Sequence, residues 1–347
     1  MPFGSSLRRA LITASGLPGA DRAVDIVEGL APRPRNRLVV LTYHRVARPG
    51  EEPDLWPGLI SATPEAFERQ AAVLAERYRV VSIGEVLAAV AGETRLPERA
   101  VAITFDDAYG DFGRHAWPVL RRRGLPVTLF VPTAYPDAAG AAFWWDRLYA
   151  AVRSAPLGSA LPGPGGTMLL AREHDRGPVF DRLRTALKAL PHDRLLEAVE
   201  LIVSATGHGA ARNPVLGWDD LRRLAAEGVA LAPHTRTHPL LTRIGEEAAL
   251  AEVTGSLDDL RARVPSAVPV LAYPSGAHDA TTAAVAARAG CVLAFTTARG
   301  GFAPARSDAY RIPRINVGGR TPAALIRAQV VWASRTAAPR SSAPREG

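Results

Sequence analysis

The sequence has almost no cysteine and almost no lysine. Its one cysteine, Cys291, excludes an internal disulfide framework, and its apolar surroundings predict a buried strand residue. The one lysine is Lys188, so the formal net charge of +8 rests almost wholly on arginine. The arginines are spread along the chain and form no basic tract of five to eight residues. We therefore expect no nucleic-acid partner, while an anionic or sugar-phosphate ligand remains open.

Long apolar runs are also missing. No window reaches the ~18 apolar residues that a membrane span needs. The apolar stretch after Arg8 and Arg9 is short and is interrupted by Gly16, Pro18 and Gly19, which argues against a signal peptide. These absences favour a cytoplasmic protein over an exported one. With 347 residues, 47% of them hydrophobic, the chain can bury a large core in one α/β domain or two smaller ones.

Apolar segments of strand length alternate with helical segments along the chain, which predicts a parallel sheet, either open or closed into a barrel. Polar residues follow the carboxyl ends of several predicted strands. These residues are Tyr43-His44, Asp106-Asp107, His234 with His238, and Tyr273-Pro274-Ser275. Because the carboxyl ends of barrel strands carry the chemistry in such folds, this pattern favours a barrel with one common site.

The chain divides into four parts by composition. Residues 1–36 form a lead segment that is helical around Asp21 to Leu30, and residues 37–334 form the barrel. A mainly helical insertion interrupts the barrel at about residues 137–214. The polar tail, residues 335–347, is predicted to be disordered.

Two adjacent acids, Asp106 and Asp107, end the predicted buried strand that begins at Val101. Neighbouring carboxylates repel each other and resist burial, so the pair suggests function rather than stability. The arrangement is reasonable if one aspartate holds a cation and the other handles a proton. The residues alone do not say which does which.

His234 and His238 are four positions apart and are flanked by Pro233 and Pro239. A pair with this spacing can serve as surface or capping residues. Combined with one carboxylate, however, two imidazoles make a three-ligand set that leaves positions open for water and substrate. The sequence therefore predicts a divalent metal site.

The segments Thr104-Phe105-Asp106-Asp107 and His234-Thr235-Arg236-Thr237-His238 resemble two motifs of the polysaccharide deacetylase family, the NodB-homology or carbohydrate esterase 4 enzymes. Tyr273-Pro274-Ser275-Gly276 is similar to that family's third motif. The resemblance covers roughly residues 37–330, outside much of the insertion. It implies a distorted (β/α) barrel of seven or eight strands and a hydrolase acting on carbon–nitrogen bonds other than peptide bonds.

The resemblance also implies roles for individual residues. Asp106 would be the general base, and Asp107, His234 and His238 would hold the metal, expected to be zinc with cobalt or nickel as alternatives. The backbone N–H of Ser275 would bind the oxyanion, and we place Tyr273 of the same motif in the substrate site.

The sequence departs from the family pattern at two places. Ala272 stands where the family's third motif has an arginine, and the late Leu-x-x-His motif that supplies the general acid is not recognisable. His44 follows Tyr43 as in the branch that contains the biofilm poly-N-acetylglucosamine deacetylases, so we expect His44 to be the general acid, although it could simply cap a strand. Arg314 is the candidate replacement for the missing arginine.

Two aromatic positions complete the candidate site. Tyr109 either packs over the barrel mouth or contacts a sugar face. Trp145, within Trp144-Trp145-Asp146, either anchors the insertion or offers a surface on which a sugar ring stacks.

The expected function is metal-dependent removal of N-acetyl groups from an amino-sugar polysaccharide or glycoconjugate, with the N-acetylated glycan as partner. One alternative is hydrolysis of a small non-polymeric amide, such as an acetylated intermediate or a cyclic amide. Another, from a different class, is a catalytically inactive glycan-binding barrel.

Overall fold

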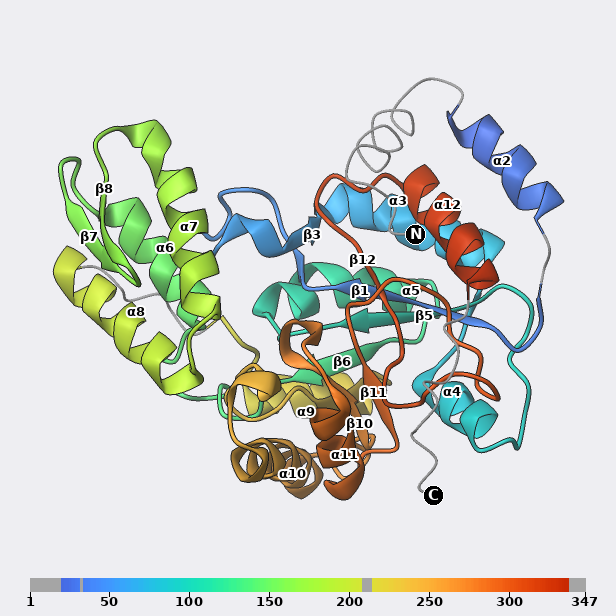
Figure 1. The fold of residues 1–347 in the computed structure, drawn as a ribbon. Helices are drawn as coiled ribbons and strands as arrows, with labels where there is room; N and C mark the ends of the chain where they lie inside the picture. The colour runs from blue at the N-terminus through green and yellow to red at the C-terminus, as the bar shows by residue number, and fades with distance from the viewer. Residues whose placement is uncertain (1–19, 32–33, 208–213, 337–347) are drawn as a thin grey trace, which may run out of the picture.

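A parallel β-sheet forms the centre of the protein in a computed structural model that describes residues 20–31, 34–207 and 214–336 (Figure 1). The strands follow the order β12-β1-β5-β6-β9, and β4 pairs with the first residues of β5. Their bounds are β1 (Leu38–Tyr43), β4 (Arg79–Val80), β5 (Ala100–Phe105), β6 (Thr128–Val131), β9 (Ala230–Pro233) and β12 (Ile315–Asn316). All residues of β1 and β5 are buried, as expected for central strands that are covered on both faces.

Two further strands close this sheet into a distorted ring. β10 (Val270–Ala272) and β11 (Leu293–Phe295) pair in parallel. The amide of Val268, just before β10, donates to the carbonyl of Leu231 in β9 at 2.9 Å. On the other side, Phe295 forms a parallel bridge with Ile312, shortly before β12. The predicted α/β fold, a distorted barrel, is therefore confirmed.

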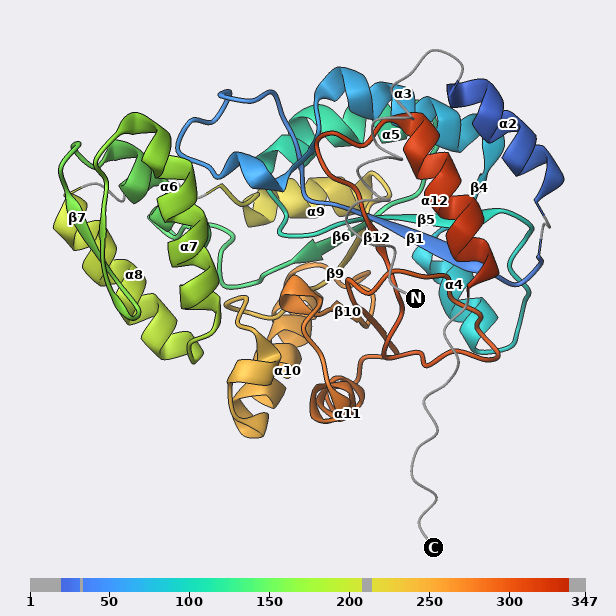
Figure 2. The same ribbon diagram turned by 45° about the horizontal axis from the view of Figure 1, so that its top comes forward.

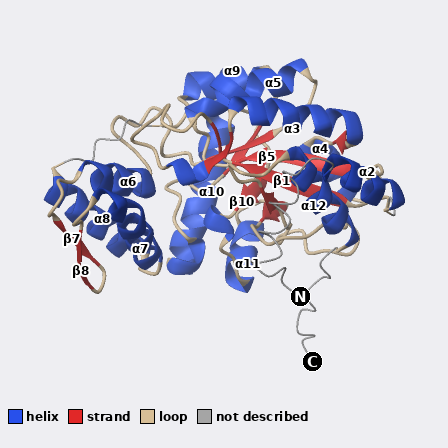
Figure 3. Ribbon diagram, turned by 90° about the horizontal axis from the view of Figure 1, so that it is seen from above, coloured by secondary structure: helices blue, strands red, loops and turns tan. Residues whose placement is uncertain are grey.

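Helices cover the outside of the strands (Figure 3). They are α2 (Ala20–Leu30), α3 (Pro64–Arg77), α4 (Ile83–Val90), α5 (Trp117–Arg122), α9 (Trp218–Ala226), α10 (Glu246–Arg263), α11 (Ala280–Arg288) and α12 (Ala323–Arg335). The start of α3 shows how local sequence determines where a helix begins. Thr63 caps α3 by accepting a hydrogen bond from the amide of Ala66, and Pro64 occupies the first turn.

The insertion is a separate helical layer at one side of the barrel (Figures 1 and 2). It contains α6 (Trp144–Ser154), α7 (Arg176–Lys188) and α8 (His192–Thr206). Between α6 and α7 lies an antiparallel hairpin, β7 (Ala160–Gly163) and β8 (Gly166–Leu169), in a segment rich in glycine and proline. Another short parallel pair, β2 (Arg45–Val46) and β3 (Ile60–Ala62), follows β1.

The ends of the chain are described only in part. The helix predicted around Asp21 to Leu30 corresponds to α2, which lies beside α12 (Figure 2). Nearly all of the tail predicted to be disordered lies outside the described residues. Within the described ranges, none of the helices combines the length and apolar character needed to cross a membrane.

Candidate metal and catalytic site

Three potential metal ligands meet at the carboxyl ends of the strands. Asp107 follows β5, and His234 and His238 follow β9; all three are buried. The Nε2 atoms of His234 and His238 lie 3.4 and 3.3 Å from Oδ1 of Asp107. Two ligand atoms that share one tetrahedral ion at about 2.0–2.2 Å are separated by about 3.3–3.5 Å, so these spacings fit a zinc-sized ion.

The hydrogen bonding of these residues also fits a metal. Oδ1 of Asp107 is buried and has no hydrogen-bond partner of acceptable geometry. Nδ1 of His234 lies 2.7 Å from the carbonyl oxygen of Ala272, which fixes the ring and leaves Nε2 directed at Asp107. An isolated buried acceptor is costly, and a cation in the middle of this set would satisfy it. The three residues therefore fit a divalent ion of the zinc type.

The charges of the set are strongly coupled. Burial alone would raise the pKa of Asp107, but its close contacts with the two histidines hold the pKa well below the usual range. Burial lowers the pKa of His238, whereas the interactions of His234 with Asp107 and Asp106 outweigh burial and raise the pKa of His234. Because a histidine binds metal only when neutral, metal uptake is expected to release protons here.

Asp106 lies beside this set and forms a two-pronged ion pair with Arg314. Each guanidinium Nη donates to one carboxylate oxygen at 2.7 Å, and Arg314 is fully buried. Nε of Arg314 donates to the carbonyl of Thr296, which fixes the guanidinium plane. Burial would raise the pKa of Asp106, but the charge of Arg314, with that of His234, lowers it overall. Asp106 is thus kept ionised and held in one orientation.

Replacing Arg314 by methionine is expected to reduce the free energy of unfolding by about 3–5 kcal/mol, the cost of leaving one buried charge without its partner. Urea denaturation of the metal-free protein measures this change. The double variant Arg314→Met with Asp106→Asn should recover part of the loss, because it removes the uncompensated carboxylate. Equal stability of the wild type and Arg314→Met proteins would contradict the assignment.

A cavity joins the ligand set to the helical insertion. Its barrel side is lined by Asp106, Asp107, His44, His234, His238, Ser275 and Thr297. Its other side is lined by Trp56 and Leu59 and by Trp144, Trp145, Arg184 and Lys188 of the insertion. The insertion therefore forms part of the site wall rather than a distant appendage.

His44 and Ser275 both lie on the wall of this cavity. His44 follows β1, and its amide donates to Oγ of Ser61 at 3.0 Å. Ser275 has a left-handed backbone conformation (φ 55°, ψ 10°) in the short 3₁₀ turn η5 (Pro274–Gly276), and its side chain is exposed. Both residues therefore line the cavity that the ligand set also lines.

Comparison with known proteins identifies the family. The sequence model described as polysaccharide deacetylase matches residues 93–159 and 174–294, more than half of the chain. The chain belongs to the polysaccharide deacetylase family. The predicted enzyme class, hydrolases of carbon–nitrogen bonds other than peptide bonds, is confirmed at the level of this family.

Curated relatives share only one stretch with this deacetylase-family chain. The poly-beta-1,6-N-acetyl-D-glucosamine N-deacetylase of Escherichia coli (strain K12) is 34% identical over 114 residues, which are 33% of this chain and 16% of the relative. The protein of the same name from Escherichia coli O157:H7 gives the same values. The match thus spans about a sixth of the length of these relatives.

Solved structures support the fold. The Streptococcus pyogenes deacetylase PplD, in complex with acetate, aligns with a TM-score of 0.57 at 21% identity and covers 85% of this chain and 98% of that one. IcaB from Ammonifex degensii aligns with a TM-score of 0.55 at 19% identity, with 85% and 97% covered.

The structure corrects the position of Tyr273, which we had placed in the substrate site. Its buried hydroxyl donates to the carbonyl of Tyr310 at 3.1 Å, and its ring stacks on His278. The side chain packs in the apolar cluster that contains Leu271, Val285 and Cys291, and it does not line the cavity. The motif brings Ser275 to the site, whereas Tyr273 supports the turn from behind.

Tyr109 is likewise a buried support rather than a sugar contact. Its hydroxyl donates to Oδ2 of Asp146 at 2.7 Å and accepts a hydrogen bond from Nε1 of Trp145 at 2.9 Å. Of the two possibilities for Tyr109, packing over the barrel mouth agrees with its 1% exposure. Trp145 lines the cavity but is 6% exposed, and its ring lies edge-to-face on His238 at 4.9 Å. Trp145 therefore fits the role of anchoring the insertion better than that of an open surface on which a sugar ring stacks.

Asp146 is the centre of a network that the sequence did not predict. It is fully buried, accepts from Tyr109, and accepts from the amide of Trp56 at 2.7 Å. Burial raises the pKa of Asp146 to about 7, against the opposing effect of these hydrogen bonds. The network ties the loop that follows β2 to the insertion and to the segment after Asp107. Its sequence signal was only that a carboxylate follows two tryptophans.

Strained backbone gathers at the site. Among the described residues, eight other than glycine have a positive φ, and five of them are Asp107, Ala108, Thr235, His238 and Ser275. Such conformations cost free energy and persist where the surrounding structure holds them in place. The loops that carry the ligands are thus held in conformations that few sequences adopt freely.

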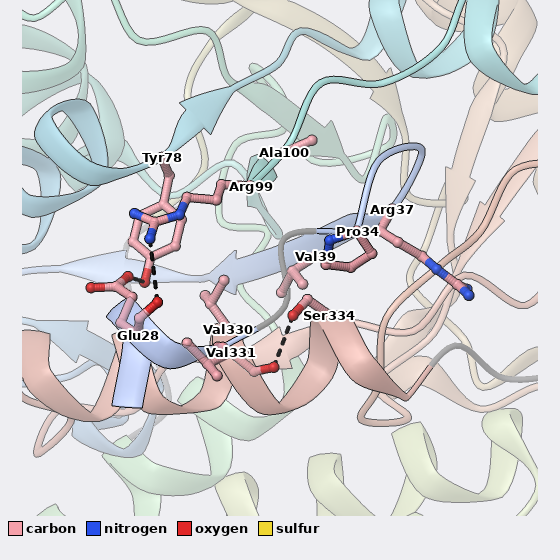
Figure 4. Close-up of a pocket in the computed structure, with 11 residues that line it drawn as sticks. Glu28, Pro34, Arg37, Val39, Tyr78, Arg99, Ala100, Val330, Val331 and Ser334 are labelled. Atoms are coloured by element: carbon pink, nitrogen blue, oxygen red, sulfur yellow. Dashed lines mark hydrogen bonds between the residues drawn. The ribbon is translucent and has the colours of Figure 1, made fainter. Parts of the chain in front are cut away.

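A second cavity lies at the opposite ends of the strands, and the contacts around it hold elements of the fold together (Figure 4). Val39 and Ala100, near the starts of β1 and β5, line it together with Glu28 of α2. Glu28 is 4% exposed, accepts a hydrogen bond from the hydroxyl of Tyr78, and forms an ion pair with Arg327 at 2.6 Å. These contacts attach α2 to the barrel, in keeping with the stabilising role of this end of a (β/α) barrel.

Proposed function

We propose that this chain is a metal-dependent hydrolase that removes N-acetyl groups from an amino-sugar polysaccharide or glycoconjugate. One observation carries the proposal: Asp107, His234 and His238 line the same cavity as Asp106, whose carboxylate is held by Arg314. Family membership and the N-deacetylase activity in the names of the curated relatives agree with it.

A divalent ion bound by Asp107, His234 and His238 would polarise the acetamide carbonyl and lower the pKa of a water molecule. Zinc suits two imidazole nitrogens and one carboxylate oxygen, with cobalt or nickel as alternatives. Asp106, kept ionised by Arg314, would accept the proton of the attacking water. The backbone N–H of Ser275 would donate to the carbonyl oxygen as negative charge develops on it.

The leaving amine must receive a proton before the carbon–nitrogen bond breaks completely. His44 is the candidate donor because it lines the cavity that contains Asp106 and Asp107. In this arrangement Asp106 takes a proton from the attacking water, and His44 gives a proton to the leaving nitrogen. Different residues therefore act as general base and general acid.

The proposal is tested with purified protein depleted of metal and then supplied with zinc. Free acetate and new primary amine are measured with N-acetylglucosamine oligomers, with small acetylated amides assayed in parallel. Equal amounts of acetate and amine from the oligomers, lost on chelation and restored by zinc, would support it. Turnover confined to the small amides would favour a hydrolase of non-polymeric substrates. Bound metal without any turnover would favour a glycan-binding barrel.

Replacing His44 by alanine is expected to lower kcat on N-acetylglucosamine oligomers about 10²–10⁴-fold, the usual contribution of a general acid. Hydrolysis of 4-nitrophenyl acetate should fall far less, because its leaving group departs without protonation. His174→Ala serves as the control, since this histidine is 72% exposed on the insertion. Equal losses of His44→Ala on both substrates would contradict the acid role.

A further inference from the structure

We propose that Arg184 and Lys188 of the insertion form a subsite for an anionic substituent, a carboxylate or a phosphate, on the N-acetylated substrate. The inference rests on the proposed deacetylase function and adds a charge requirement to it. Both residues lie on α7 and line the cavity that contains Asp106 and Asp107.

Arg184 is held firmly at the wall of this cavity. Its guanidinium lies over the ring of Trp56 at 4.6 Å from the centroid, and Phe180 of the same helix contacts that ring at 5.4 Å. The side chain of Arg184 is 25% exposed, and its ion pair with Asp181 is 3.5 Å long to a carboxylate that is 65% exposed. Its Nε is buried and has no hydrogen-bond partner. A placed guanidinium with an unused donor suits a carboxylate or a phosphate, because two oxygens of either group can accept from it side by side.

Lys188 brings a second positive charge to the same wall. Its Nζ donates to the neutral Oγ of Ser275 at 3.1 Å, across 87 residues of sequence. Burial and the neighbouring charge of Arg184 lower the pKa of Lys188, whereas the charge of Asp107 raises it. Like charges four positions apart oppose each other on a helix, so stability alone does not favour this pair. The ammonium is therefore kept beside the site at some cost, next to the residue proposed to bind the carbonyl oxygen.

Within the cavity lining, no acidic side chain is left over to pair with these two cations, because Asp181, the partner of Arg184, lies outside it. Asp106 and Asp107 are the acidic residues among those that line it. Asp106 is paired with Arg314, and Asp107 belongs to the proposed metal ligands. With a divalent ion in place, the wall formed by α7 becomes still more attractive to negative charge. A neutral N-acetylglucosamine chain provides no such charge, whereas a sugar with a carboxylate or a phosphate does.

The experiment compares three substrates with zinc-loaded protein. They are neutral N-acetylglucosamine oligomers, oligomers alternating N-acetylglucosamine with glucuronic acid, and N-acetylglucosamine oligomers that carry a phosphate ester. For each, kcat/KM is obtained from acetate release, and the dissociation constant is measured by calorimetry. The carboxylate and phosphate substrates distinguish the two sources of the anion.

The wild type is expected to prefer at least one anionic oligomer over the neutral one. Arg184→Gln and Lys188→Gln should each reduce that preference about ten- to a hundredfold, the size of a lost hydrogen bond to a charged group. The loss should appear mainly in KM and in the dissociation constant. The control is Arg182→Gln, an equal change of charge at an exposed position of α7 that does not line the cavity. It should retain the preference, and thermal melting checks that all variants fold.

Failure of this inference can be told apart from failure of the proposed function. If the neutral oligomer is deacetylated and neither anionic oligomer binds or reacts better, the subsite is wrong and the deacetylase function stands. A preference that survives in both glutamine variants also overturns the subsite. If no oligomer releases acetate but an anionic one binds tightly, and does so through Arg184 and Lys188, the subsite stands and the proposed reaction is wrong.

Discussion

An Asp107→Ala protein is expected to purify without bound metal and to lose at least about a thousandfold in turnover, because several kcal/mol of transition-state stabilisation depend on the ion. The carboxylate supplies the oxygen of the ligand set, and its Oδ1 lies within 3.4 Å of both imidazoles. Without it, two histidines remain and the charge that attracts the cation is lost.

Metal content and melting temperature measure this effect independently of activity. Zinc should raise the melting temperature of the wild type, because a ligand that binds only the folded state stabilises it, and should leave Asp107→Ala unchanged. His238→Ala is expected to behave in the same way. Stoichiometric zinc in Asp107→Ala with normal turnover would show that the ion lies elsewhere.

An Asp106→Asn protein is expected to keep its metal and to lose turnover about 10²–10⁴-fold, the usual contribution of a general base. Asparagine preserves the size of the side chain but cannot take a proton from water. The three metal ligands remain, so zinc content should stay close to that of the wild type. The two substitutions at neighbouring positions therefore separate metal binding from proton transfer.

Asp106→Asn also leaves the buried Arg314 without a negative partner, so stability must be controlled. The double variant with Arg314→Met removes that charge and should be more stable than Asp106→Asn alone. It should nevertheless remain inactive, because the base is still missing. Activity recovered together with stability would indicate that Asp106 only supports the structure.

The set of metal ligands could be predicted from the sequence because its members lie just after the ends of strands. Asp107 is the second residue after β5 and His234 is the first after β9, and parallel strands bring their carboxyl ends to one edge. The mainly helical character of the insertion was also predicted, and α6, α7 and α8 confirm it. The β7–β8 hairpin was not, because its glycines and prolines are typical of loops.

The direction of side chains beyond the end of a strand was harder to predict from the sequence. Tyr273 and Ser275 are two positions apart, yet the left-handed turn at Ser275 separates them, one in an apolar cluster and the other at the cavity. Tyr109 was predictable as an aromatic near the site. Its hydrogen bond to Asp146 depends on how the insertion packs, and no local pattern encodes that packing.

The sequence by itself therefore predicted the α/β barrel and the family, and it proposed Asp106, Asp107, His234 and His238 as the central residues of the site. These predictions follow from the periodicity of the strands and from motifs in which residues of a given chemical type occupy defined positions in the chain. Tertiary structure decided which distant residues complete them. Arg314, named from the sequence only as a candidate, is shown by the fold to reach Asp106 across 208 positions, and Lys188 reaches Ser275 from the insertion. Such pairs depend on the packing of whole elements, because a long-range contact leaves no periodic trace in either segment.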